Sequence, residues 1–264
     1  MTGKVAVITG GSRGIGAGLV TGYRGRGWAV VASALTIKPS EESDLLTVAG
    51  DIADPGTADR IADAALDRFG RIDTLINNAG VFVSKPFTDY TAADYALLTG
   101  VNLGGFFWLT QRVIAEMTRR YGGHVVNVSA SLAEVANSHA PSVLAALTKG
   151  GLAAATRSLA VEYASRGIRV NAVSPGIIQT PVYPADSYGG LDDQLPPLGR
   201  LGQVSDVVAG VLFLESSPYI TGRSCTSTAA GPRVTRLGYL LLTPMVGVTC
   251  LRPGCSAGPP SWRS

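Results

Sequence analysis

The chain has 264 residues, of which 46% are hydrophobic and 16% are charged, and its formal net charge is +3. This composition describes a globular protein with a substantial core, and no stretch reaches the roughly 18–20 uninterrupted apolar residues of a membrane span. Residues 1–222 carry 17 Lys and Arg against 19 Asp and Glu, whereas residues 223–264 carry five Arg, no acid and all three cysteines. The longer segment is mildly acidic and free of cysteine, which predicts neither a nucleic-acid partner nor a metal site.

The chain enters a strand pattern almost at once, so we expect no signal peptide and a cytoplasmic location. Short apolar strands are predicted at "VAVITG" (5–10), "AVVASA" (29–34), "DLLTVAGD" (44–51), "IDTLINNAG" (72–80), "GHVVNVSA" (123–130) and "IRVNAVSPG" (168–176). Helices are predicted between them at 14–27, 56–70, within 91–120 and at 142–165. This alternation predicts an α/β, single-domain Rossmann fold over residues 1–222, a doubly wound parallel sheet with helices on both faces. Residues 181–199 have neither period and are expected to form a loop or lid.

The segment "TGGSRGIG" (9–16) joins the first strand to the first helix, with glycines at 10, 14 and 16. Glycines let the backbone approach a pyrophosphate, and the helix N-terminus supplies N–H donors and partial positive charge. Tight packing between strand and helix also selects glycine, so the turn alone leaves both interpretations open.

Three further motifs stand in order along the chain: "NNAG" (77–80), "VN" (101–102) and "SPGIIQTP" (174–181). Together with the glycine turn and Lys149, they resemble the short-chain dehydrogenase/reductase family, and the resemblance runs from about residue 4 to residue 222. It implies a nicotinamide cofactor, a small-molecule substrate, and a homodimer or homotetramer.

The resemblance also implies roles by position. Lys149 would hold the nicotinamide ribose and lower the pKa of a neighbouring tyrosine, and Asn102 would anchor a water in a proton relay. Alternatives are that Asn77 and Asn78 only end a strand, that Lys149 is a solvated helix lysine, and that Asn102 has no relay to serve. The cofactor-binding residues implied by the family pattern are Gly10, Ser12, Arg13, Gly14, Ile15, Gly16, Ser33, Asp51, Ile52, Asn78, Ala79, Gly80, Lys149, Pro175, Gly176, Ile178 and Thr180.

The chain departs from the family pattern at the catalytic tyrosine. The family motif is Y-x-x-x-K, but residues 145–149 read A-A-L-T-K, which puts Ala145 at the tyrosine position. The family serine is matched by Ser129 or Ser131, and counting back from Lys149 favours Ser131. Replacement proton donors could come from His139 or from Tyr183 and Tyr188 of the predicted lid.

Without that tyrosine, we expect hydride transfer to an iminium, imine or hemiaminal carbon, because an iminium needs no acid in the hydride step. The alternatives are a carbonyl reductase or alcohol dehydrogenase with another proton donor, and a non-catalytic NADP-binding sensor.

The second strand predicts the choice of cofactor. NAD-binding proteins of this fold place an acid at the end of that strand for the ribose 2′-hydroxyl, but this chain has Ser33, Ala34 and Leu35 there. Arg13, with Lys38, could pair with a 2′-phosphate, so NADP(H) is predicted in preference to NAD(H).

Residues 223–264 do not continue the family pattern, which ends in a strand close to "TGEILHVDGG". The segment "RSCTSTAAGPRVTR" (223–236) can be reverse-translated so that one added base in front reads EILHVDGGRAAGH followed by a stop. The sequence therefore predicts that residues 223–264 are an out-of-frame translation in which the last strand is absent or improvised. A genuine arginine- and proline-rich extension is the alternative.

Overall fold

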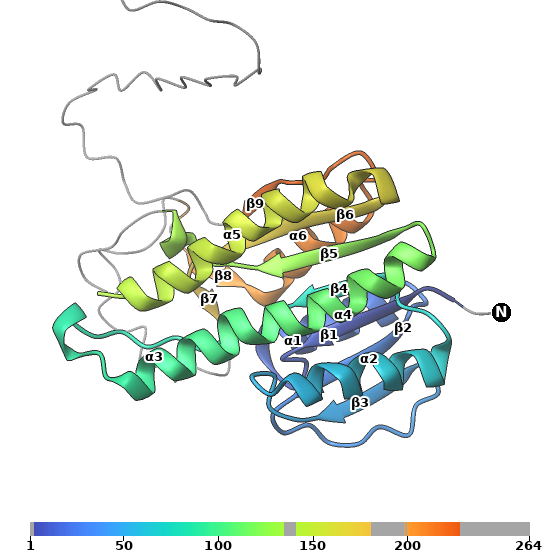
Figure 1. The fold of residues 1–264 in the computed structure, drawn as a ribbon, viewed down its shortest axis with the longest axis horizontal. Helices are drawn as coiled ribbons and strands as arrows, with labels where there is room; N and C mark the ends of the chain where they lie inside the picture. Colours follow the sequence, from blue (N-terminus) through green and yellow to red (C-terminus); the bar gives the residue numbers. More distant parts are fainter. Residues whose placement is uncertain (1–2, 135–140, 181–197, 199, 228–264) are drawn as a thin grey trace, which may run out of the picture. The chain divides into compact units, whose positions relative to one another are not determined.

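The computed structural model describes residues 3–134, 141–180, 198 and 200–227, and its main sheet contains seven parallel strands in the order β3-β2-β1-β4-β5-β6-β9 (Figure 1). The strands are β1 (Val5–Thr9), β2 (Ala29–Ala34), β3 (Leu45–Ala49), β4 (Thr74–Asn77), β5 (Gly123–Val128), β6 (Ile168–Pro175) and β9 (Ser224–Ser227), and β7 (Ile178–Gln179) pairs separately with β8 (Gly202–Gln203). The helices are α1 (Gly14–Arg24), α2 (Pro55–Phe69), α3 (Ala92–Leu98), α4 (Gly105–Arg119), α5 (Val143–Tyr163) and α6 (Val204–Glu215), with a π-helical turn at Thr99–Gly104 and 3₁₀ turns at Phe87–Asp89, Ser131–Ala133 and Ala164–Arg166.

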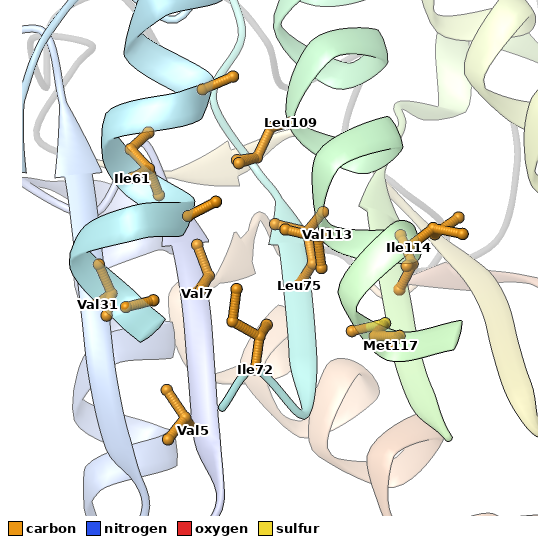
Figure 2. Packing of buried hydrophobic residues seen from close by; sticks show 14 of the residues in the cluster. Val5, Val7, Val31, Ile61, Ile72, Leu75, Leu109, Val113, Ile114 and Met117 are labelled. Carbon is orange, nitrogen blue, oxygen red and sulfur yellow. The ribbon is translucent and has the colours of Figure 1, made fainter. Parts of the chain in front are cut away.

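The sheet is covered on both faces, as the sequence predicts for a doubly wound Rossmann fold. Helices α2, α4 and α5 pack on one face, and α1 and α6 pack on the other (Figure 1). Figure 2 shows how Ile61 of α2 and Val113 of α4 meet the side chains of β1 and β4 in the first of these layers. Every residue of β1 is buried, which is why this strand reads as an uninterrupted apolar run rather than an alternating one.

Local signals set the ends of helix α2. The carboxylate of Asp54 accepts a hydrogen bond from the backbone N–H of Gly56 at 3.0 Å, and Pro55 occupies the first helical position, where its missing N–H costs nothing. Gly70 ends the helix in the left-handed region with φ of +73°. No described helix, α2 included, is both long enough and apolar enough to cross a bilayer.

The sheet extends past residue 222, because residues 224–227 form β9 and pair with β6 from Ala172 to Pro175. Of the two expected outcomes, an absent or an improvised last strand, residues 224–227 rule out the absent one. Backbone hydrogen bonds hold the chain against this edge before the strand begins. Gly222 donates its N–H to Val170 O at 2.7 Å, and Ala172 donates its N–H to Arg223 O at 2.8 Å. The main-chain bonds of β9 follow the parallel pattern of the rest of the sheet, and Cys225 packs against the core beneath it. Residues 228–264 lie outside the described residues.

A buried polar cluster ties α6 to the amino ends of the central strands. One oxygen of Glu215 accepts hydrogen bonds from Tyr23 at 3.0 Å and Thr74 at 2.8 Å, and lies 3.0 Å from Nδ1 of His124. The other ring nitrogen of His124 faces two donors, Arg169 at 3.3 Å and Asn171 at 3.1 Å. That nitrogen must therefore accept, which fits a neutral imidazole that donates from Nδ1 to the carboxylate.

This cluster makes folding stability depend on pH. Burial lowers the pKa of His124 below its ordinary value of 6.5 and outweighs the opposing effect of Glu215. The unfolded chain therefore takes up a proton at a higher pH than the folded chain does, and stability is lost as the pH falls below 6.5.

We expect His124→Gln to flatten the pH dependence of folding stability between about pH 5 and pH 8, because the titrating group is removed. The same variant should lower folding stability at neutral pH, because Glu215 loses a hydrogen-bond partner. Chemical denaturation across this range measures both effects. His139→Gln, which changes the other histidine of the chain, is the control and should keep the slope of the unmodified protein. A slope that follows His139 instead of His124 would contradict this assignment.

Candidate functional site

The candidate site lies where the strand order of the sheet reverses, between β1 and β4. In open α/β sheets, ligands bind in the crevice outside the carboxyl ends of the strands at such a switch point. The side chain of Asn78, just after β4, donates to the carbonyl of Thr9 at 2.8 Å, and the Thr9 hydroxyl accepts from the backbone N–H groups of Asn78 and Ala79, both at 3.0 Å. Asn78 therefore joins the ends of β1 and β4 by hydrogen bonds, which is more than the alternative interpretation that it only ends a strand.

The glycines of the turn are required by space and conformation. Gly10 and Gly14 have φ of +67° and +56°, in the region that favours glycine. A Cβ on Gly16 would lie 2.0 Å from the carbonyl oxygen of Gly10 and 2.7 Å from Nδ2 of Asn78. The first turn of α1 thus lies directly against the turn that precedes it.

The N-terminus of α1 can bind an anion. Its N-cap residue is Arg13, which is extended and makes no side-chain capping bond to the first turn. The first N–H groups of a helix have no partner within the helix, and together with the helix dipole they favour a phosphate. Ser12 and Arg13 are exposed beside this end, whereas Ile15 packs into the core beneath it.

Lys149 lies on α5 beside the ends of β4 and β5. Its Nζ donates to the carbonyl of Val128 at 2.8 Å, and an atom in the side-chain position of Gly80 would lie 3.1 Å from it. Burial lowers the pKa of Lys149 to about 8, since no carboxylate among the described residues pairs with it. This is not a solvated helix lysine. One turn earlier stands Ala145, which is only 2% exposed and packs with Leu98 and Leu144.

Asn102 lies in the π-helical turn that precedes α4 and is buried. Its carboxamide accepts from the N–H of Val81 at 2.9 Å and donates to the carbonyl of Val81 at 3.1 Å and to the hydroxyl of Thr148 at 3.1 Å. Both bonds that Nδ2 donates go to the protein, so a water that Asn102 anchors would bind Oδ1 or the main chain. Single π turns inside helices often mark functional sites.

The structure separates the two candidate serines. The Ser129 hydroxyl is buried and donates to the backbone carbonyl of Lys149 at 3.1 Å, so it supports the helix. Ser131 begins the 3₁₀ turn Ser131–Ala133 and is half-buried, which favours it as the reactive hydroxyl.

Glu134 follows that turn and contacts the last two strands, which the sequence did not suggest. Its carboxylate accepts from Ser174 at 3.1 Å, from Ser224 at 3.4 Å and from Thr226 at 3.3 Å. Two of these hydroxyls belong to β9, which therefore reaches the turn that carries Ser131.

The remaining predicted cofactor residues lie around the same edge of the sheet, some with their side chains turned away. Ser33 is buried and its carbonyl accepts from Gly11 N at 2.9 Å, while Asp51 binds the N–H of Ala53 at 3.0 Å. Ile52 packs against Gly105, and Thr180 returns to the start of α1, where its Cβ lies 3.6 Å from the side-chain position of Gly14. Pro175 ends β6 and Gly176 follows it. Ile178, in β7, is buried and its side chain lies against Gly202 of β8. His139, Tyr183 and Tyr188 lie outside the described residues.

A glycine turn at a switch point, an open helix N-terminus and a half-buried lysine define a Rossmann-fold oxidoreductase that binds a nicotinamide dinucleotide. A sequence model described as enoyl-(acyl carrier protein) reductase matches residues 10–227. The chain belongs to the short-chain dehydrogenase/reductase family and is an NAD(P)-dependent oxidoreductase of that type.

Relatives of the chain have several substrates. It is 32% identical over 254 residues to L-fucose dehydrogenase of Mus musculus, covering 90% of each chain. It is also 32% identical over 233 residues to 3-oxoacyl-[acyl-carrier-protein] reductase FabG of Escherichia coli (strain K12), covering 84% of this chain and 94% of the relative.

Solved structures of similar fold hold either cofactor. ElxO with NADP bound has a TM-score of 0.80 at 27% identity and covers 86% of this chain and 98% of that one. The 3-ketoacyl-(acyl-carrier-protein) reductase from Brucella melitensis complexed with NADH has a TM-score of 0.79 at 28% identity, with the same coverage.

Proposed function

We propose that this protein is an NADPH-dependent reductase whose favoured acceptor is an iminium, imine or hemiaminal carbon. The observation that carries this proposal is Ala145, which stands one helical turn before the half-buried Lys149 and offers only a methyl group. Reduction of a ketone produces an alkoxide that must be protonated, and a positioned general acid contributes about 10²–10⁴-fold to such a step. Hydride addition to an iminium gives a neutral amine, so it needs no acid at that point.

The residues of the chain have separate tasks in this proposal. The bound nicotinamide supplies the hydride. The first turn of α1, which begins at Gly14, would hold the pyrophosphate through its unpaired N–H groups and the helix dipole. Lys149 would hold the nicotinamide ribose, Ser131 would lie beside the acceptor, and Asn102 would anchor a water. The binding energy is used to align the reacting carbon with the cofactor, which is the main catalytic device when no acid is present.

A carbonyl reductase is the second candidate function. The matched relatives are named for hydroxyl and carbonyl chemistry, and FabG is named as an oxoacyl reductase. This function would require a proton donor other than residue 145. Tyr183 and Tyr188 are the tyrosines of the predicted lid that could supply it. A non-catalytic NADP-binding sensor is the third, and would bind NADPH without turnover.

The preference for NADP(H) rests on the end of β2. Ser33 is buried, Leu35 is 70% exposed, and neither can accept a hydrogen bond from a ribose 2′-hydroxyl as a carboxylate does. Arg13 and Lys38 are both exposed near the first two strands, where a 2′-phosphate would need a cation.

NADPH should therefore bind more tightly than NADH, and Arg13→Ala should narrow the difference by roughly 1.5–3 kcal/mol, because a charge-assisted phosphate contact is lost. Titration calorimetry with both cofactors measures the two affinities. Arg26→Ala, an arginine at the far end of α1, is the control and should leave the difference unchanged. Equal or better NADH binding by the unmodified protein would refute the preference.

Cyclic imines should be reduced faster than matched ketones by the unmodified protein, and Ala145→Tyr should raise ketone turnover by about 10²–10⁴-fold. Steady-state NADPH oxidation on both substrate sets measures this ratio. Ala145→Phe adds the same ring without the hydroxyl, so it separates acid catalysis from packing at this buried position. Faster turnover of ketones than of imines by the unmodified protein would overturn the proposed acceptor.

We also propose a cytoplasmic homodimer or homotetramer, supported by an apolar face on α4 and α5. Phe107 and Trp108 are 51% and 38% exposed on α4, and they line a shallow groove with Gly151 and Ala155 of α5. Val161, further along α5, is 82% exposed. A second copy of the chain would bury this face, because small residues on α5 permit close approach of helices.

We retain the proposal that residues 223–264 are an out-of-frame translation. Cys225 of β9 packs against the core on the α1 and α6 face, where the shifted frame would place a leucine. A larger apolar side chain at that position would bury more surface, worth roughly 0.8 kcal/mol per methylene.

Replacing residues 223–264 with EILHVDGGRAAGH should thus raise the melting temperature and promote assembly. Calorimetry and light scattering measure the two effects. A chain truncated after Ser227 is the control, because it removes the remaining tail without changing β9. If the replaced chain melts no higher than the truncated one, the shifted frame has no structural benefit.

A further inference from the structure

Thr148, the residue before Lys149, joins α5 to the π-helical turn. Its hydroxyl is fully buried, donates to the carbonyl of Ala145 at 3.0 Å and accepts from Nδ2 of Asn102 at 3.1 Å. A hydroxyl has one proton, so the bond to Ala145 leaves Thr148 only as an acceptor toward Asn102.

Thr148 and Val81 together decide how the Asn102 carboxamide is turned. Thr148 requires the NH₂ group on its side, and the N–H of Val81 requires the oxygen on the other, 2.9 Å away. Nδ2 also donates to the carbonyl of Val81 at 3.1 Å. The three residues therefore specify one orientation of the amide, and its reversal would face donors with donors.

Asn102 and Lys149 form one wall of the site around Gly80. An atom in the side-chain position of Gly80 would lie 3.1 Å from Nζ of Lys149 and 3.3 Å from Oδ1 of Asn102. A displacement of the carboxamide would therefore move Gly80 and Val81 relative to the lysine. Buried polar bonds of this kind define a unique arrangement when every member is satisfied.

We propose that Thr148 is a positioning residue, which holds Asn102 and the Gly80–Val81 loop in register with Lys149. It acts through these groups and does not itself touch the substrate. The inference rests on the proposed reductase function for its catalytic consequence, whereas the positioning itself can be measured without turnover.

The chain supplies a matched control on the same helix. Thr156 is also buried, donates to the carbonyl of Leu152 at 2.8 Å and accepts from Nδ2 of Asn127 at 2.9 Å. It has the same kind of bonds as Thr148, two turns further from the site. Thr156→Val should cost similar folding stability, since each variant leaves an asparagine amide short of one partner.

The experiment compares Thr148→Val, Thr148→Ser and Thr156→Val with the unmodified protein. We expect Thr148→Val to lower kcat on the fastest imine or ketone substrate by about tenfold or more, with a much smaller change in NADPH affinity, because misalignment affects the reacting geometry most. Thr148→Ser restores the hydroxyl and should recover kcat to within about twofold of the unmodified protein. Thr156→Val should keep it. Equal loss of kcat in both valine variants would overturn the proposal.

Amide hydrogen exchange at Val81 separates this proposal from the proposed function. Exchange should accelerate in Thr148→Val and stay unchanged in Thr156→Val, because the Val81 N–H bonds the carboxamide that Thr148 orients. If the unmodified protein reduces nothing, the reductase proposal fails, while faster exchange in Thr148→Val alone still supports positioning. Unchanged exchange in Thr148→Val would refute positioning even in an active enzyme.

Discussion

The close approach of α1 to the end of β1 is the constraint on which the candidate site depends. With a Cβ position on Gly16 only 2.0 Å from the carbonyl of Gly10, the helix can begin there only if residue 16 has no side chain. Asn78 reaches across from β4 to the same carbonyls and fixes the second strand against the first. The crevice at the switch point and the donors of the helix N-terminus follow from this contact. The residues of α5 and the π turn then add chemistry to a shape that is already defined.

Buried hydrogen bonds of asparagine recur through the described part of the chain, and each joins elements that come from different segments. Asn77 binds Thr110 and Asn127 in the layer beneath the site, and Asn127 in turn binds Thr156. No buried side-chain nitrogen or oxygen among the described residues lacks a partner. Apolar packing allows helices to slide on a sheet, whereas these bonds have one correct register each. The arrangement of α4 and α5 over β4 and β5 is therefore specified more closely than apolar burial alone would specify it.

Sequence reasoning recovered the features that have a local signal. The strand runs follow from periodicity, the importance of the glycine turn and Lys149 follows from the family resemblance, and the structure has the predicted parallel sheet with helices on both faces. The joining of β1 and β4 by Asn78, the orientation of Asn102 and the contacts of Glu134 rest on bonds between residues 21 to 92 positions apart, and no local pattern encodes them. The π turn could not be predicted from the sequence either, because it adds one residue to a stretch whose pattern is that of a continuous helix. Read from the sequence, the family resemblance ends at residue 222, whereas the family model matches to residue 227 and residues 224–227 form a strand at the edge of β6.

The edge of β6 thus binds an extended segment through its main chain, while the side chains of that segment add contacts of their own, Cys225 with the core and Ser224 and Thr226 with Glu134. Thr221 and Gly222 set the register before the strand begins, through bonds to the backbone of Val170. For protein engineering, this makes the last strand a graft point at which the main-chain pairing with β6 and an apolar side chain at position 225 are the two features to keep.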